Sequence, residues 1–106
     1  MSQHFVHLHV HTEYSLLDGA ITLPKLVDHA KSQGAKALAI TDHGNIFGAV
    51  KFFQLCKKAG INPILGMEAY MAEDVHERVV DKKYYHLIIL VQNEIGYKKA
   101  HIKWAF

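Results

Sequence analysis

Histidines recur at alternate positions near the start of the chain, in the segment HFVHLHVH at residues 4–11. Side chains alternate between two faces of a β-strand, so a strand here places Phe5, His7, His9 and His11 on one face. The opposite face is mostly apolar and suited to packing under helices. Two imidazoles at i and i+2 lie about 6–7 Å apart along a strand, close enough to share or flank a metal ion.

An isolated H-x-H motif more often consists of partly buried, hydrogen-bonded histidines than of metal ligands. The third histidine on the same face, together with Asp18 a few residues later, favours metal binding here. We therefore predict that His9, His11 and Asp18 bind metal. His7 lies deeper in the predicted strand, and we expect it to support the ligands without binding the ion itself.

Further ionisable side chains follow the other apolar segments. His43 and Asp42 come directly after the apolar run at residues 37–40, and we assign His43 to metal. Asp42 either orients an imidazole or caps the next helix. Glu68 follows an apolar strand, where a lone carboxylate is costly to bury, so it is paired with a cation or bound to metal. His86 begins a strongly apolar segment and is predicted to be the most buried histidine.

The candidate metal ligands are thus four imidazoles and two carboxylates, namely His9, His11, Asp18, His43, His86 and, if it is not paired with a cation instead, Glu68. Such a set, with no group of cysteines, suits Zn²⁺, Mn²⁺ or Fe²⁺. Clustered metal ions bridged by a carboxylate lower the pKa of bound water and clamp the oxygens of a phosphate ester. We therefore predict phosphoester hydrolysis, with Glu68 and His43 as the catalytic residues.

Composition limits the other possibilities. The chain has 106 residues, of which 50% are hydrophobic, and this suffices for one small core. A formal net charge of +2 gives no basic footprint for direct nucleic-acid binding. The single cysteine, Cys56, fits a reducing compartment. With no secretory signal and no apolar run long enough to span a bilayer, a cytoplasmic protein without membrane contact is expected.

Strands and helices must alternate to position these side chains. Apolar periodicity and end signals predict strands at residues 4–11, 37–40, 62–69 and 84–92. They predict a helix from Thr22 to Gly34, one from Asn45 to about Ala59, and one from about Asn93. In the second helix the predicted inward side is Phe47, Val50, Phe53 and Leu55. Residues 72–83 are charged and irregular, and we predict an exposed loop there.

Strand-helix-strand units imply parallel strands with helices outside. Either a doubly wound sheet or a (β/α) barrel begins in this way, and the histidine face favours the barrel, whose interior carries active-site residues at the carboxyl ends of the strands. Only four strands are predicted, so we expect residues 1–106 to be the N-terminal part of an incomplete domain.

Four motifs in order, FVHLHVHTEYSLLDG, ALAITDHGNIFGAVKFF, AGINPILGMEAY and HLIILVQNEIGY, resemble the polymerase-and-histidinol-phosphatase (PHP) domain at the N-terminus of bacterial DNA polymerase III alpha subunits. The resemblance covers residues 4–97. It implies a distorted seven-stranded barrel of the triosephosphate isomerase type with a trinuclear zinc or manganese centre. Motif by motif, it assigns the same six ligands.

The resemblance also implies a metal-dependent 3′–5′ exonuclease within a DNA-directed DNA polymerase, with DNA, a proofreading exonuclease subunit and a sliding clamp as partners. The family's later ligands have no counterpart in this sequence, so weaker metal binding and reduced activity are expected. Two alternatives stay open. One is a stand-alone phosphatase acting on a substrate such as histidinol phosphate, and the other is a non-catalytic structural module of the replicase.

Overall fold

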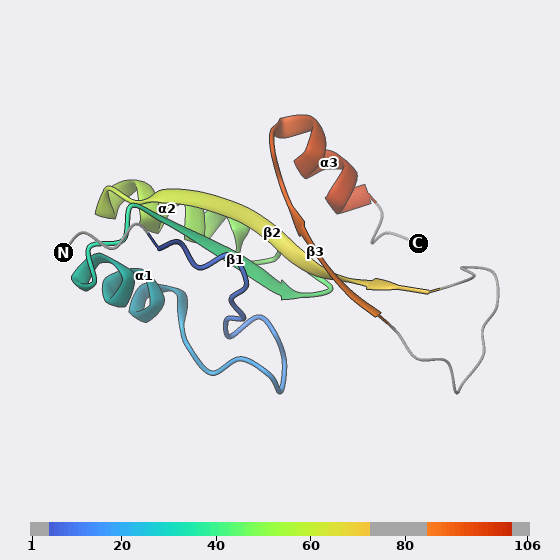
Figure 1. The fold of residues 1–106 in the computed structure, drawn as a ribbon, viewed down its shortest axis with the longest axis horizontal. Helices are drawn as coiled ribbons and strands as arrows, with labels where there is room; N and C mark the ends of the chain where they lie inside the picture. Colours follow the sequence, from blue (N-terminus) through green and yellow to red (C-terminus); the bar gives the residue numbers. More distant parts are fainter. Residues whose placement is uncertain (1–4, 73–84, 103–106) are drawn as a thin grey trace.

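The computed structural model describes residues 5–72 and 85–102. This part of the chain folds into three strands and three helices around one curved sheet (Figure 1). In chain order the elements are α1 (Leu23–Ser32), β1 (Ala37–His43), α2 (Ala49–Ala59), β2 (Asn62–Met71), β3 (Tyr85–Leu90) and α3 (Glu94–Ile102). The predicted loop at residues 72–83 falls almost entirely outside the described residues.

The three strands lie in the order β1-β2-β3. β1 and β2 are parallel, and the last residue of β1, His43, is opposite Glu68. β3 is antiparallel to β2, with His86 opposite Tyr70, so the prediction of an all-parallel sheet is wrong. The physical reason is the connection: a parallel crossover needs a dozen or more residues, usually a helix, and the charged, irregular segment before β3 carries no helical pattern.

The predicted opening strand is also wrong in detail, because residues 5–12 form no regular strand. They run in extended form along β1, where the amides of Ala39 and Thr41 donate hydrogen bonds to the carbonyls of His7 (3.1 Å) and Val10 (2.8 Å). The two acceptors are three residues apart and the two donors only two apart. The segment therefore carries one extra residue, as in a β-bulge. The amide of Val10 donates instead to Thr41 Oγ1 at 2.9 Å.

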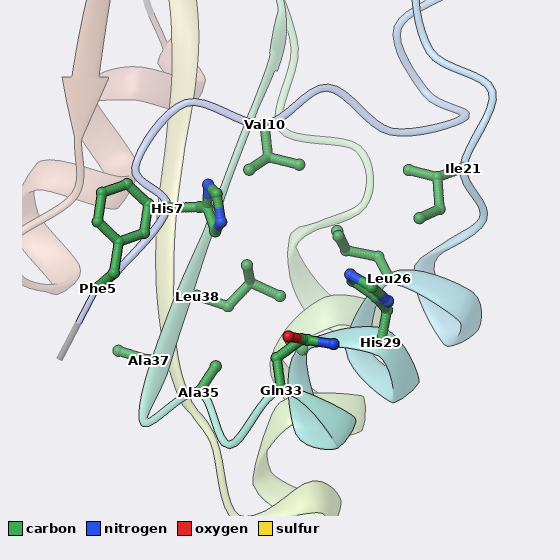
Figure 2. Close-up of a pocket in the computed structure, with 11 residues that line it drawn as sticks. Phe5, His7, Val10, Ile21, Leu26, His29, Gln33, Ala35, Ala37 and Leu38 are labelled. Carbon is green, nitrogen blue, oxygen red and sulfur yellow. The ribbon is translucent and has the colours of Figure 1, made fainter. Parts of the chain in front are cut away.

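The bulge turns His7 away from His9 and His11. His7 lines a cavity of about 460 Å³ between the opening segment and α1, where Val10 and His29 also lie (Figure 2). The prediction that three histidines share one face is therefore wrong: one extra residue reverses the side of every residue before it.

Helix α1 forms as its sequence predicts. Thr22 occupies the N-cap position, Pro24 lies in the first turn, and Gly34 follows the helix with a φ of +71°. This left-handed conformation is readily adopted by glycine and ends the helix. The predicted apolar stripe is fully buried and consists of Leu23, Leu26, Val27 and Ala30. It packs with side chains of β1 and α2, including Leu38, Ile40 and Phe52, to form the core.

Helix α2 differs from its prediction in both start and orientation. It begins four residues later than Asn45, whose side-chain amide instead donates to the carbonyls of Tyr14 and His43, at 3.0 Å each. The sequence holds two apolar stripes one position apart, and periodicity alone does not choose between them. The buried stripe is Ala49, Phe52 and Cys56, while the predicted Phe47, Val50 and Phe53 are exposed and Leu55 is half-buried.

Candidate metal centre

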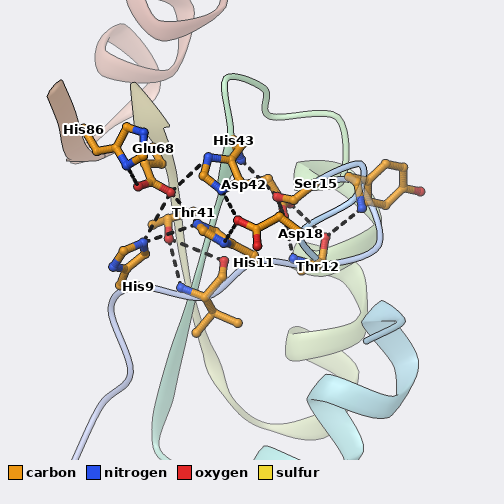
Figure 3. Close-up of polar contacts among 12 residues, drawn as sticks. His9, His11, Thr12, Ser15, Asp18, Thr41, Asp42, His43, Glu68 and His86 are labelled. Carbon is orange, nitrogen blue, oxygen red and sulfur yellow. Dashed lines mark hydrogen bonds and ion pairs between the residues drawn. The ribbon is translucent and has the colours of Figure 1, made fainter. Parts of the chain in front are cut away.

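All six predicted ligands gather at one end of the sheet (Figure 3). Glu68 lies near the carboxyl end of β2, next to His43 at the end of the parallel strand β1. His86 lies near the amino end of β3, and the antiparallel pairing brings that end to the same place. The opening segment contributes His9 and His11, and the loop after it contributes Asp18.

Glu68 is the centre of the cluster. Its side chain is buried, and its Oε2 lies 2.5 Å from His11 Nε2, 3.2 Å from His43 Nδ1 and 3.4 Å from His9 Nε2. Its Oε1 lies 2.8 Å from Nδ1 of His86. Burial acts to raise the pKa of this carboxyl group, but hydrogen bonds with His11 and His9 and the charge of nearby imidazoles lower it overall. Glu68 is therefore ionised at neutral pH.

Asp18 closes the opposite side of the cluster. Its Oδ2 contacts His43 Nε2 and lies 3.3 Å from His11 Nδ1. The hydrogen bond with His43 is the main cause that lowers the pKa of Asp18. Because His11 meets Glu68 through one ring nitrogen and Asp18 through the other, its imidazole joins the two carboxylates.

These side chains fit a divalent metal ion. Two groups of three residues place their donor atoms within 4.8 Å of one another: His9, His11 and Glu68, and His11, Asp18 and His43. The Nε2 atoms of His9 and His11 are 3.3 Å apart. Two nitrogens bound tetrahedrally to one zinc ion, each at about 2.0–2.1 Å, are also separated by roughly 3.3 Å.

Asp42 fixes the loop beside the cluster through hydrogen bonds. Its buried carboxylate accepts hydrogen bonds from the amide (2.6 Å) and hydroxyl (2.8 Å) of Thr12 and from the hydroxyl of Ser15 (2.7 Å). Ser15 Oγ in turn accepts a hydrogen bond from the amide of His43 at 3.0 Å. Asp42 therefore neither caps a helix nor contacts an imidazole, as its two predicted roles required. It ties the loop that carries the proposed ligand Asp18 to β1.

Gly19 allows that loop to return past its own start. A Cβ atom on Gly19 would lie 1.9 Å from the carbonyl oxygen of Thr12, so no side chain fits there. Beyond this contact, the amide of Glu13 donates to the carbonyl of Ile21 at 2.9 Å and closes the base of the loop. The tight closure holds Asp18 next to the imidazoles of His11 and His43.

The cluster is open to solvent on one side of the described structure. The side chains of His86 and His9 are 53% and 55% exposed, respectively. The prediction that His86 is the most buried histidine is therefore wrong. In the described part of the chain, β3 has a neighbouring strand on one side only, and most of its residues are exposed. The apolar residues that follow His86 therefore do not bury its imidazole.

Three nearby residues were missed by the sequence reasoning. Thr12 and Ser15 are recognisable only as small hydroxyl residues between two proposed ligands, which is a weak signal in the sequence. Tyr70 has a clearer sequence signal, because it lies two positions after Glu68 on β2 and so faces the same side of the sheet. Its hydroxyl lies 3.5 Å from His43 Nδ1.

The family follows from comparison with known proteins. Residues 7–102 match the model of the PHP domain, and the chain belongs to this family. Among curated proteins, DNA polymerase III subunit alpha of Treponema pallidum is 54% identical over 102 residues, and that of Aquifex aeolicus is 45% identical over 107. The alignments cover 92% of this chain but 9% of each relative, so the chain spans less than a tenth of their length.

Solved structures share the fold. An amidohydrolase from Chromobacterium violaceum and a putative metal-dependent phosphoesterase from Bifidobacterium adolescentis each superpose with a TM-score of 0.67 at 23% identity. Each match covers 92% of this chain and 32% of the other chain. Among the described helices, none combines the length and apolar character needed to cross a membrane.

Proposed function

We propose that the six clustered side chains bind a divalent metal cluster of zinc or manganese, with iron as a further candidate. The observation that carries this proposal is the convergence on Glu68, where three imidazole nitrogens lie within 3.4 Å of one carboxylate oxygen. Nothing in a hydrogen-bonded core requires such crowding, whereas a shared metal site does. His9, His11, Asp18, His43, Glu68 and His86 are the proposed ligands.

The proposed activity is metal-dependent hydrolysis of phosphoesters. A bound cluster supplies a water of lowered pKa and a clamp on the phosphate oxygens. The oxygen of a water molecule forms a bond to phosphorus and gives up a proton, the bond from phosphorus to the leaving oxygen breaks, and the leaving oxygen takes up a proton. Glu68 and His43 are the proposed catalytic residues, since the ionised carboxylate and the imidazole beside it would hold a bound metal ion.

The proposed substrate is the 3′ end of DNA, within a bacterial replicative polymerase. Identity of 45–54% to DNA polymerase III alpha subunits supports this assignment. We infer DNA, the proofreading exonuclease subunit and the sliding clamp as partners of the whole protein, and the cytoplasm as its location.

The arrangement of layers supports a barrel-like fold for the whole domain. Leu38 and Ile40 point from β1 to the helices, while Glu68 and the other ligands lie on the opposite face of the sheet. A barrel has the same division between a helix-covered outer surface and an interior that carries ligands at the strand ends. We propose that residues 1–106 supply the first strands of such a barrel.

The test is to purify the full chain, measure its bound metal, and follow nucleotide release from a 3′-labelled DNA strand with and without Mn²⁺. Metal-dependent release that is lost in the Glu68→Gln variant is the expected result. Faster turnover of histidinol phosphate than of DNA ends would instead assign a small-molecule phosphatase. Absence of bound metal, with His9→Ala changing only stability, would assign a structural module and overturn the catalytic proposal.

A further inference from the structure

An apolar cleft opens directly beside the proposed metal centre. It has a volume of about 360 Å³ and is lined by Tyr14, Leu16, His43, Asn45, Phe47 and Tyr70. Two of these side chains project into solvent, Leu16 with 86% and Phe47 with 79% of its surface exposed. Large apolar side chains exposed together at the rim of a polar site mark a binding surface.

Tyr70 connects this cleft to the metal centre. Its ring lies nearly parallel to the imidazole of His43, with an angle of 11° between the planes and 6.3 Å between the ring centres. The Tyr70 hydroxyl lies 3.5 Å from His43 Nδ1. The same imidazole therefore faces the cluster with Glu68 and borders the cleft. The cleft therefore adjoins the position that a phosphate at the proposed metal centre would occupy.

The loop that carries Asp18 also exposes two apolar side chains to solvent, those of Leu16 and Leu17. Leu17 is the only described non-glycine residue with a positive φ, at +66°, and it is fully exposed. A bulky residue is rarely found in this conformation, and such strain concentrates at functional sites. The turn holds Leu16 and Leu17 in solvent next to a proposed ligand, where packing within the described residues gives no reason for them.

The lining residues give the cleft flat apolar surfaces. They offer few polar groups that could form specific hydrogen bonds with a ligand. The side-chain amide of Asn45 donates to the carbonyls of Tyr14 and His43, and its oxygen accepts from the amide of Phe47. These bonds shape the turn and leave little for a ligand. Among the six described lining residues none is Lys, Arg, Asp or Glu. Aromatic surfaces of this kind bind nucleobases by stacking, with little dependence on base identity.

We propose that this cleft binds the base of the nucleotide whose phosphoester lies at the metal centre, with Phe47 and Tyr70 as stacking surfaces. The inference rests on the proposed function and sharpens it, because it selects nucleotides over phosphates that lack a base. It also gives the site no preference among the four bases.

Two measurements on the full chain test this inference. The first compares the rates at which the protein with Mn²⁺ releases a normal and an abasic 3′-terminal nucleotide from DNA. The second titrates a strand that ends in 2-aminopurine, whose fluorescence falls on stacking, with Ca²⁺ in place of Mn²⁺. We expect the normal end to be released at least about fivefold faster than the abasic end. Phe47→Ala should reduce this ratio to below about twofold and remove the quenching, while Phe47→Trp should retain both.

Phe53→Ala is the matched control, because Phe53 is an exposed phenylalanine of α2 that does not line this cleft. It should leave both the ratio and the quenching unchanged. Metal-dependent release that ignores the presence of the base, with no quenching, would overturn the cleft assignment and leave the proposed hydrolysis intact. Quenching that depends on Phe47, without hydrolysis of any substrate, would support the cleft and overturn the proposed activity.

Discussion

His86 Nδ1 lies 2.8 Å from Glu68 Oε1, although the two residues belong to strands that run in opposite directions. Glu68 pairs in register with Ile88, two residues after His86, so both side chains face the same side of the sheet. This diagonal contact exists because β3 is antiparallel. In a parallel strand, a histidine near the start would lie at the far end of the sheet from Glu68.

The two neighbouring histidines of the opening segment should behave differently when they are replaced. His9 lies 3.4 Å from Glu68, whereas His7 lines the cavity beside α1. We expect His9→Ala to weaken metal binding by about tenfold or more, and His7→Ala to leave it unchanged. Metal titration by calorimetry provides the measurement. Equal losses in the two variants would show that the bulge does not separate the two side chains.

Replacing the central carboxylate should remove metal while leaving the fold intact. Glu68→Gln keeps the size of the side chain but removes the charge that the imidazoles surround. We expect bound metal, measured by mass spectrometry after dialysis, to fall at least about tenfold. Glu94→Gln is the control, because Glu94 is an exposed residue of α3 that pairs with Lys98, away from the cluster. Retention of metal by Glu68→Gln would contradict the proposed centre.

The sequence predicts those features of the structure that are determined by local pattern. The stripe of α1 is predictable because Leu23, Leu26 and their partners form a single apolar face with a clear end at Gly34. The proposed ligands His43 and Glu68 can be picked out by residue type and by their positions near the ends of apolar strands. Local pattern is sufficient for both.

Other features depend on interactions between distant residues. The bulge between His7 and Val10 lies where Thr41 Oγ1 accepts the hydrogen bond of the Val10 amide. The partners of Asp42 are Thr12 and Ser15, about thirty residues earlier in the chain. β3 runs antiparallel to β2, a direction that the apolar run of β3 itself does not specify. Hydrophobic periodicity carries no information about any of the three.

The buried carboxylate of Asp42 should matter more for stability than any exposed acid. Asp42→Ala leaves the hydroxyl of Ser15 and the hydroxyl and amide of Thr12 without their acceptor. We expect the free energy of unfolding, measured with urea, to fall by about 3 kcal/mol or more. Asp28→Ala, on the exposed face of α1, should change it by less than about 0.5 kcal/mol. Similar values for both would contradict the anchoring role.

The loop that carries Asp18 should not tolerate a side chain at Gly19. A methyl group there would lie 1.9 Å from the carbonyl oxygen of Thr12, so the backbone must move. We expect Gly19→Ala to destabilise the fold by about 1–3 kcal/mol and to weaken metal binding through displacement of Asp18. Gly96→Ala is the control, since its nearest contact would be 3.8 Å away and alanine favours a helix. Unchanged metal affinity in Gly19→Ala would show that Asp18 does not contribute to metal binding.

The buried thiol of Cys56 should make stability depend on pH in alkaline solution. Burial raises the pKa of this thiol from 9.0 to about 11, so the folded chain keeps a proton that the unfolded chain releases. Stabilisation by the protonated thiol is therefore complete below pH 9 and is lost as the pH rises towards 11, by about 3 kcal/mol in total.

Other groups titrate in the same range, so the measurement is the difference in unfolding free energy between the natural chain and Cys56→Ala at each pH. We expect that difference to be constant up to pH 9. Above pH 9 the natural chain should lose stability relative to Cys56→Ala, because its unfolded state releases the thiol proton more readily than its folded state does. A thiol reagent should also react with the folded protein far more slowly than with the unfolded one, since Cys56 is fully buried. A constant difference from pH 8 to 11, together with rapid reaction of the folded protein, would show that Cys56 is accessible to water.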